Sequence, residues 1–265
     1  MNDFIVIRAS SMPELFDCPS RWEAKNIRKI RMPSSGNSVL GRSVHAATAV
    51  FDSAVLDGNP ITIDDASGVV ADTIRNPDEE VDWGEDKPQD AENIGIALTG
   101  MYCRQIAPSM DYVAVEATCE RLEIIDIGIA LTGTTDRVVK TADGHAIADI
   151  KTGKSAVAAD GTVKTQGHAA QMAVYELIAE SSTGIQIDSP AKVIGLQVAK
   201  TDKGRRAGVG KIQGGRELIL GDEDSPGLLE HAAAIIKSGL FPGNPRSMMC
   251  HAKYCPIHGA CKWRK

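Results

Sequence analysis

Two aspartates and a lysine stand close together near the middle of the chain. Asp136 lies in the segment LTGTTDRVV, and Asp149 and Lys151 lie in IADIKTGK. On a strand, Asp149 and Lys151 would project to one face while Ile150 faces the other way, because side chains alternate along a strand. Carboxylate oxygens suit Mg²⁺ or Mn²⁺, and a neighbouring lysine can orient or activate a water. These residue types favour metal-assisted hydrolysis of a phosphodiester.

A turn signal connects the two acidic segments. Asp143-Gly144 is typical of a tight hairpin turn, and hairpin pairing would bring Asp136 alongside Asp149. An isolated Asp-x-Lys triplet is common by chance and then marks only strand-end charges. The Gln-x-x-x-Tyr pattern in the segment that follows, QGHAAQMAVYEL, favours a site over that alternative.

Four segments together resemble the RecB-type nucleases of the PD-(D/E)XK superfamily. They are G-R-S-V-H (41–45), G-T-T-D-R-V (133–138), D-I-K-T-G (149–153) and Q-M-A-V-Y (171–175). The resemblance follows the order of the family's motifs and covers most of the chain, from Cys18 to Cys261. It implies a restriction-endonuclease-like core and metal-dependent DNA cleavage, usually exonucleolytic.

The resemblance also implies roles for individual residues. Asp136 and Asp149 would ligate the metal, the carbonyl of Ile150 would complete the shell, and Lys151 would be catalytic. The second acid is Asp149 where many relatives carry glutamate, a substitution that the superfamily tolerates.

Further site residues follow from the same resemblance. Gln171 and Tyr175 would contact DNA or brace the site, and His45 would be an additional metal ligand. A lone histidine on an apolar helix face is otherwise a packed, hydrogen-bonded residue, and both interpretations stay open. Glu116 would bind a second metal or orient a ligand, with a solvated strand acid as the alternative.

Cysteines cluster near the two ends of the chain. Cys18 stands in C-P-S-R-W, and Cys250, Cys255 and Cys261 fall within a dozen residues of the tail. This arrangement resembles the iron–sulfur subgroup that includes the AddB nuclease domain and the CRISPR-associated RecB-like exonucleases. Four thiolates match the ligand count of a [4Fe–4S] cluster.

Other interpretations of the cysteines remain open. Zinc is the alternative metal, with His251 or His258 as a ligand, although two C-x₂-C pairs typical of a zinc ribbon are missing from the sequence. A cluster that joined Cys18 to the tail would have a structural role, and the chain-entropy model gives on the order of 5 kcal/mol as an upper value. Cys103 and Cys119 are expected to be ordinary buried thiols.

A glycine-rich segment over 200–211 concentrates positive charge. Its cations are Lys200, Lys203, Arg205, Arg206 and Lys211. Flexible cations in a loop suit sequence-independent phosphate contacts, so this loop is a candidate DNA-binding element. A solvated hairpin tip is the alternative.

The composition bounds the class of protein. The formal net charge of -6 does not by itself indicate nucleic-acid binding, and a hydrophobic content of 43% suffices for a substantial core. We expect no signal peptide and no membrane span. A cytoplasmic protein, of a bacterium or a phage-infected host cell, is therefore expected.

The pattern of elements predicts an α/β fold with a mixed central sheet flanked by helices. Helices are expected over 12–30, 38–57, about 60–75, 89–106, 164–182 and 224–238, and strands over 112–127, 129–139, 145–150, 191–199 and 217–220. One nuclease domain over 1–265 would comprise a mainly helical part (1–107), a catalytic α/β core (108–240) and a Cys-rich tail (241–265).

The expected function is a metal-dependent DNA nuclease, foremost an exonuclease, that processes DNA ends in recombination, repair or phage replication. Recombination or replication proteins are candidate partners, and the sequence does not decide the oligomeric state. The alternatives are a non-catalytic DNA-binding subunit of the same fold and a structural assembly protein with a zinc-bound tail.

Overall fold

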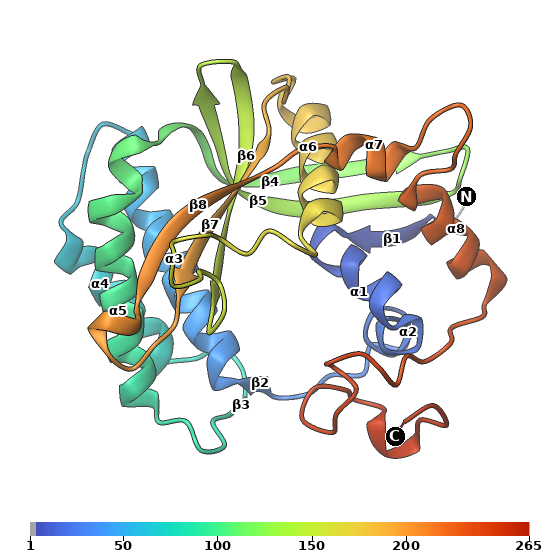
Figure 1. Ribbon diagram of the computed structural model, residues 1–265, viewed down its shortest axis with the longest axis horizontal. Coiled ribbons are helices and arrows are strands. Elements are labelled where there is room, and N and C mark those ends of the chain that lie inside the picture. The colour runs from blue at the N-terminus through green and yellow to red at the C-terminus, as the bar shows by residue number, and fades with distance from the viewer. Residues whose placement is uncertain (1–3, 265) are drawn as a thin grey trace.

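The computed structural model describes residues 4–264, and a mixed β-sheet with helices on both faces forms its centre (Figure 1). Within these residues the sheet has six strands in the order β1-β5-β6-β7-β8, with β4 pairing β5. The strands are β1 (Ile5–Arg8), β4 (Asp111–Ile124), β5 (Ile129–Thr141), β6 (Gly144–Gly153), β7 (Ala191–Gln197) and β8 (Arg206–Ile212). The expected α/β class with a mixed central sheet is confirmed.

Two groups of helices cover the sheet. One group contains α1 (Met12–Asp17), α2 (Pro19–Asn26), α6 (Ala169–Thr183), α7 (Gly215–Leu220) and α8 (Leu228–Ser238). The other contains α3 (Gly36–Leu56), α4 (Ile63–Arg75) and α5 (Pro88–Gln105). Short elements complete the fold: η1 (Ala9–Ser11), η2 (Ala107–Ser109), η3 (Asp202–Gly204), η4 (His258–Ala260), and the parallel pair β2 (Ser34–Ser35) and β3 (Val81–Asp82). Within residues 4–264, the helices are all too short or too polar to cross a bilayer.

Side chains alternate between the two faces, as a strand requires. Val138 and Ile147 belong to the core under α6, whereas Val139, Ala148 and Ile150 belong to the core under α3 and α5. A helix layer therefore covers each face of β5 and β6. Asp136 and Asp149, which stand on these strands, are both buried.

Strand β5 forks the sheet. Its first residues pair with β1 in parallel (Ile129–Thr132), and its last residues pair with β6 in an antiparallel hairpin (137–141). The residues between these stretches, 133–136, pair with neither β1 nor β6. On its other edge, β6 pairs with β7 from Ala148 to Gly153, and Figure 1 shows the strands diverging from one region. The backbone pairing between β5 and β6 therefore ends at Arg137 and Ala148, and we call the unpaired region beyond it the notch.

Glycines allow two close approaches near this notch. A Cβ atom on Gly133 would lie 3.0 Å from Ile178 and 3.1 Å from Tyr175, so the glycine lets α6 approach β5. A Cβ atom on Gly41 would lie 3.1 Å from the hydroxyl of Thr152, at the end of β6. Both contacts are tighter than a side chain tolerates without displacement of its neighbour.

Two of the expected helices and strands differ from the observed ones. The single helix expected over 12–30 is divided at Cys18, because Pro19 has no N–H to continue α1 and instead begins α2. The strand expected over 217–220 is part of α7. A short apolar segment does not by itself distinguish a strand from a buried helix.

The basic segment is a loop only in part. Residues 206–212 form β8, which pairs along its whole length with β7, whereas Lys200, Lys203 and Arg205 lie in the connection between these two strands, which contains η3. Strand β1 was not anticipated from the sequence. The expected starts of α6 at 164 and α8 at 224 lie several residues before the observed starts, whereas the hairpin around the Asp143-Gly144 turn is confirmed.

A buried ion pair joins α3 to β5. The guanidinium of Arg137 donates to Asp52 Oδ2 at 2.6 Å, and neither side chain is exposed. The hydroxyl of Tyr102 donates to the same oxygen at 2.6 Å, and Arg137 also donates to Thr48 Oγ1 at 3.2 Å. Its Nη1 donates to the carbonyl of Asp136 at 2.7 Å. Residues from α3, α5 and β5 are thereby fixed around one guanidinium.

Removing one partner of this pair should destabilise the fold strongly. A lone buried charge costs about 3–5 kcal/mol, so Arg137→Met should lower the free energy of unfolding by about that amount. Asp52→Leu should act similarly, and the double variant should lose less than the sum of both. Urea denaturation measures these differences, with Lys140→Met on the same strand as an exposed control. Single variants within about 1 kcal/mol of wild type, a typical surface value, would contradict this account.

Candidate metal and active site

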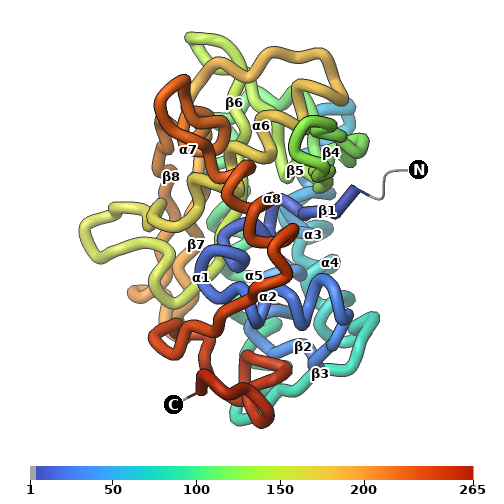
Figure 2. The backbone as a smooth tube through the Cα atoms, turned by 90° about the vertical axis from the view of Figure 1, so that its right-hand side faces the viewer, coloured from blue at the N-terminus to red at the C-terminus, as the bar shows by residue number. Residues whose placement is uncertain are grey.

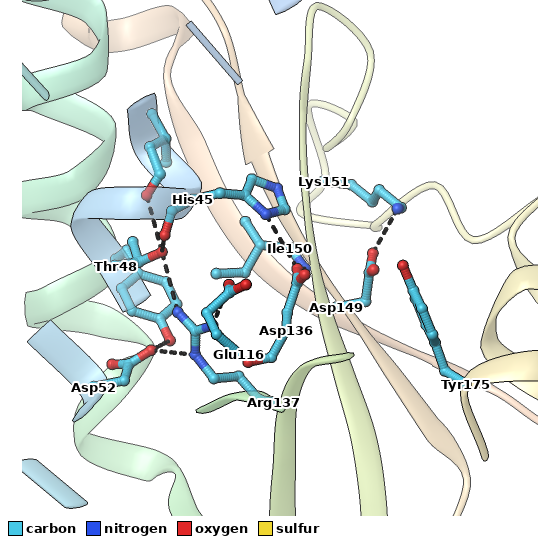
Figure 3. A network of polar contacts seen from close by, with 12 residues as sticks. His45, Thr48, Asp52, Glu116, Asp136, Arg137, Asp149, Ile150, Lys151 and Tyr175 are labelled. Carbon is cyan, nitrogen blue, oxygen red and sulfur yellow. Dashed lines mark hydrogen bonds and ion pairs between the residues drawn. The ribbon is translucent and has the colours of Figure 1, made fainter. Parts of the chain in front are cut away.

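The notch between β5 and β6 contains the two predicted aspartates. The hairpin ladder ends at the pair Arg137 and Ala148, so Asp136 and Asp149 are the next residues on each strand. Helix α3 contributes His45 from one face of the sheet, and α6 contributes Tyr175 from the other (Figure 3). The hairpin thus brings both acids together, as the turn signal indicated.

Asp136 bridges the two strands with its side chain. Its Oδ2 accepts the backbone N–H of Ile150 at 2.8 Å and lies 3.2 Å from His45 Nδ1. Burial raises the pKa of Asp136, but His45, the Ile150 N–H and Arg137 outweigh burial and leave the pKa below its usual value. Asp136 is therefore the more acidic member of the pair of acids.

Asp149 is held differently. Burial and the nearby charge of Asp136 raise its pKa to about 6, although Lys151 opposes the shift. The ammonium of Lys151 lies 2.7 Å from Asp149 Oδ2, yet this buried oxygen accepts no directed hydrogen bond. Two neighbouring carboxylates therefore differ in pKa because one is anchored by donors and the other is not.

Lys151 is oriented by α6. Its ammonium donates to Gln171 Oε1 at 3.0 Å, and Gln171 Nε2 donates to the hydroxyl of Tyr175 at 3.1 Å. Burial raises the pKa of Tyr175, so the phenol is neutral. The sequence predicted that these three residues share the site, and the structure joins them in one chain of hydrogen bonds.

His45 and Glu116 complete the polar lining. Burial lowers the pKa of His45, but Asp136 more than compensates, and the pKa is raised overall. The strand register places Glu116 opposite Asp136, since Val115 pairs with Arg137 and Ala117 with Thr135. Glu116 adopts φ 47°, a left-handed conformation that is costly for a residue with a side chain. Burial and Asp136 raise its pKa, and Arg137 Nη1 lies 3.4 Å from its carboxylate.

The donor set fits a hard divalent cation. Carboxylates, one imidazole and a backbone carbonyl are oxygen-rich ligands of the kind Mg²⁺ and Mn²⁺ take, and the buried Asp149 Oδ2 lacks a hydrogen-bond donor. Within residues 4–264, however, no three His, Cys, Asp or Glu side chains lie close enough together to form a ready metal-binding group. Lys151 instead neutralises Asp149 in this structure.

Four cysteines line one small cavity between α2 and the tail. They are Cys18, at the start of α2, and Cys250, Cys255 and Cys261 of the tail, all free thiols, although within residues 4–264 no three of these side chains form a ready metal-binding group. The backbone N–H of Asn244 donates to the sulfur of Cys18 at 3.4 Å. Burial raises the pKa of Cys255, and the neighbouring Cys18 and Cys261 raise it further. Cys103 and Cys119 are buried elsewhere, as expected.

The predicted basic residues are not brought to the acids. Lys200 lies 3.6 Å from Asp90, and Arg205 bonds the carbonyls of Ala199 and Lys200. Arg206 donates to the carbonyl of Val157. Lys203 lies in η3 and Lys211 on β8. These contacts hold β8 and its preceding turn in place.

The sequence did not reveal two residues that support the site, Arg137 and Asp52. Arg137 stands within the motif G-T-T-D-R-V, directly after Asp136, and Asp52 stands seven residues after His45, on the same face of α3. An acid at that helical spacing from a candidate ligand was the available signal. This signal could not identify Arg137 as the partner of Asp52, because the two residues are 85 positions apart.

Comparison with known proteins identifies the family. The sequence profile of the PD-(D/E)XK nuclease superfamily matches residues 9–262, almost the whole chain. The chain belongs to the PD-(D/E)XK nuclease superfamily. Asp149, Ile150 and Lys151 have the acid-x-lysine pattern of that name, and Asp136 is the preceding acid, with Thr135 in the place of proline.

Comparisons with solved structures and with curated proteins add little to the family assignment. The crystal structure of a protein named SSO0001 is similar, with 12% sequence identity, a TM-score of 0.46, and coverage of 98% of this chain and 87% of that one. No curated protein matches.

The raised pKa of Asp149 predicts how the metal-free protein responds to pH. Its folded value of about 6 exceeds the ordinary value of 3.8, so the folded state holds this proton more tightly than the unfolded state. The free energy of unfolding should therefore fall by on the order of 2–3 kcal/mol as pH rises from about 4 to 6. His45, whose pKa is also raised, acts in the same direction above about 6.5.

Asp149→Asn should remove the first part of this decline. Its Tm should exceed that of wild type at neutral pH and lose the advantage near pH 4, as thermal melts in chelator would measure. Asp143→Asn, in the exposed hairpin turn, is the matched control. Parallel pH profiles for wild type and Asp149→Asn would show that folding does not raise the pKa of Asp149.

Proposed function

We propose that this protein is a metal-dependent deoxyribonuclease that hydrolyses phosphodiester bonds at the notch between β5 and β6. One observation carries the proposal. Two buried carboxylates of different pKa share the notch, and the lysine that follows one of them is oriented by α6. Such a group of residues is costly to bury, and structures keep it chiefly where it acts on a ligand.

Each residue has a role in the proposal. Asp136, Asp149, His45 and the carbonyl of Ile150 would hold Mg²⁺ or Mn²⁺, with Glu116 available for a second ion. When bound, the metal supplies Lewis-acid stabilisation of the charge on the phosphate oxygens. The low pKa of Asp136 keeps it ionised as a ligand at neutral pH. Asp149, with a pKa of about 6, is also ionised there.

Lys151 would act on the water and the phosphate directly. Its ammonium is held between Asp149 and Gln171, so its position is fixed from two directions before substrate arrives. A preorganised cation of this kind stabilises the negative charge that develops on a phosphate oxygen. Gln171 and Tyr175 act through Lys151, and Tyr175 remains a neutral donor near the substrate.

The finer assignment is an exonuclease that processes DNA ends in recombination, repair or phage replication, with recombination or replication proteins as partners. The motif order, from G-R-S-V-H to Q-M-A-V-Y, supports this assignment. We assign one functional unit to the whole chain, with a helical part, a core and a tail, and a cytoplasmic site of action. Residues of α2 and of the tail line the same cysteine cavity, which supports treating these segments as one unit.

We further propose that the four cysteines hold a [4Fe–4S] cluster. The donor set supports it: Cys18, Cys250, Cys255 and Cys261 line one cavity and are reduced. The zinc alternative uses His258, which lines the same cavity. The cluster would clamp α2 to the tail, because the cysteines stand in both segments, and no redox step is required of it.

Lys151→Ala and Asp149→Ala should abolish metal-dependent degradation of DNA. Loss of a group that stabilises developing charge lowers kcat by about 10²–10³-fold. The measurement uses end-labelled linear and circular DNA, single- and double-stranded, with Mg²⁺ or Mn²⁺. Lys140→Ala, an exposed lysine on β5, should keep full activity. Wild-type rates in both site variants would remove the proposed mechanism.

Protein purified without oxygen should be brown and contain about four iron atoms and four sulfides per chain. Cys250→Ser should lose the colour and the iron, whereas Cys119→Ser, a buried thiol outside the cavity, should retain both. Colourless protein with stoichiometric zinc would establish the other metal.

A further inference from the structure

A pocket of about 240 Å³ lies between α2, the segment that leads into α3, and the tail. Figure 2 shows the tail beside α2 at the end of the molecule where β2 and β3 lie. Arg21, Lys25, Arg31, Ser38, Lys253 and Tyr254 are among its lining residues. We name this site the basic pocket. None of the acids of the notch and none of the four cysteines lines it.

Positive charge dominates the basic pocket. Its lining contains four cations and no acid. Arg21 and Lys25 share one carboxylate, that of Glu14, at 2.6 and 2.8 Å. Arg31 and Lys253 form no ion pair within residues 4–264, and both are exposed. Glu14 thus neutralises part of the charge of Arg21 and Lys25, and the other two cations are available to a ligand.

One further acid approaches the rim of the pocket. Glu79 accepts from the hydroxyl of Ser34, but Arg42 lies 2.7 Å from the same carboxylate oxygen and neutralises it. The field in the pocket therefore remains positive and favours an anion.

The two walls of the basic pocket are tied together. Arg21, a buried side chain of α2, donates through Nε to the carbonyl of Tyr254 at 3.0 Å. Arg31 donates to the carbonyl of Lys25 at 3.3 Å. Tyr254 is 41% exposed, so an aromatic residue stands beside the cations. Such a combination of cations and an accessible aromatic residue suits an unpaired nucleotide.

The position of the pocket relates it to the notch. Helix α3 contributes Ser38 to the basic pocket and His45 to the notch, seven residues later. At 1.5 Å per residue this separation is about 10 Å. A DNA strand advances about 3.4 Å per nucleotide in a duplex and further when extended, so a few nucleotides cover the distance.

We propose that the basic pocket binds the phosphate backbone of a single DNA strand, a few nucleotides from the phosphate that is cleaved at the notch. The inference rests on the proposed function for its substrate. Arg31 and Lys253 contact phosphate oxygens, and Tyr254 stacks on a base. The strand is single because paired bases do not present a face to a side chain on a pocket wall.

Binding without divalent metal tests the proposal independently of hydrolysis. Fluorescence anisotropy with an oligothymidine of about 12 nucleotides should show at least about tenfold weaker affinity for Arg31→Ala/Lys253→Ala. The slope of log affinity against log salt should become shallower by about 1.4, since each phosphate contact in a single strand contributes about 0.7. Tyr254→Ala should weaken binding about fivefold or more.

A matched control removes the same charge from the same two segments. Arg28→Ala/Lys262→Ala changes residues outside the pocket lining, and it should stay within about twofold of wild type with an unchanged salt slope. Equal weakening in the two double variants would show a diffuse charge effect and overturn the proposal. Wild-type binding by Arg31→Ala/Lys253→Ala would overturn it as well.

A small substrate separates this inference from the nuclease assignment. Hydrolysis of bis(p-nitrophenyl) phosphate with Mn²⁺ should be unchanged in Arg31→Ala/Lys253→Ala, because that ester is too short to reach the basic pocket from the notch. A parallel loss of this activity would place the two residues in the notch's own machinery and overturn a separate subsite. If wild type hydrolyses neither the ester nor DNA, the nuclease assignment fails while the binding comparison still decides the pocket.

Discussion

The hydrogen bond from the backbone of Ile150 to the carboxylate of Asp136 determines the geometry of the site. The ladder between β5 and β6 ends at Arg137 and Ala148, and the next contact across the gap is made by this side chain at 2.8 Å. A strand pair normally closes such a gap with backbone bonds. Here a carboxylate replaces them, so the acid is fixed at the fork, and its position sets that of Asp149.

This hydrogen bond helps to explain why Asp136 and Asp149 differ in pKa. Asp136 has donors from β6 and α3, which hold its pKa low, whereas Asp149 has burial and a like charge, which raise its pKa. The ion pair between Arg137 and Asp52 fixes α3 against β5. His45 lies on the same helix, two turns before Asp52, so the buried pair also sets the imidazole against Asp136. The stability of the fold and the geometry of the site therefore depend on the same contacts.

Local spacing in the sequence predicted that Asp149 lies beside Lys151 and that Gln171 lies beside Tyr175. The two-residue period of a strand places Asp149 and Lys151 on one face, and a four-residue helical spacing places Gln171 beside Tyr175. These relations hold over short distances in the sequence and depend little on the rest of the fold. The mixed sheet followed from the same periodicities. The contact between Asp52 and Arg137 did not follow from these periodicities, because the two residues lie 85 positions apart.

Other elements were mispredicted for equally physical reasons. Residues 217–220 have an apolar composition that fits a strand, but they belong to α7, where Ile219 packs into the core under α6. The cations of 200–211 resembled a flexible loop because glycine is frequent there. Pairing with β7 overrides that local preference over residues 206–212, which form an edge strand, while residues 198–205 remain the connection between β7 and β8.

The tail shows how distant parts of the chain combine in one surface. Lys253 and Tyr254 stand between Cys250 and Cys255, so whatever fixes those cysteines also fixes the tail's side of the basic pocket. The other side is fixed by Arg21, which follows Cys18 by three residues and reaches the carbonyl of Tyr254 across 233 positions of sequence. The cysteine cavity therefore lies directly behind a positively charged surface. A bound cluster there would act on substrate through the placement of these side chains, while the geometry at the fork depends on the sheet together with α3 and α6.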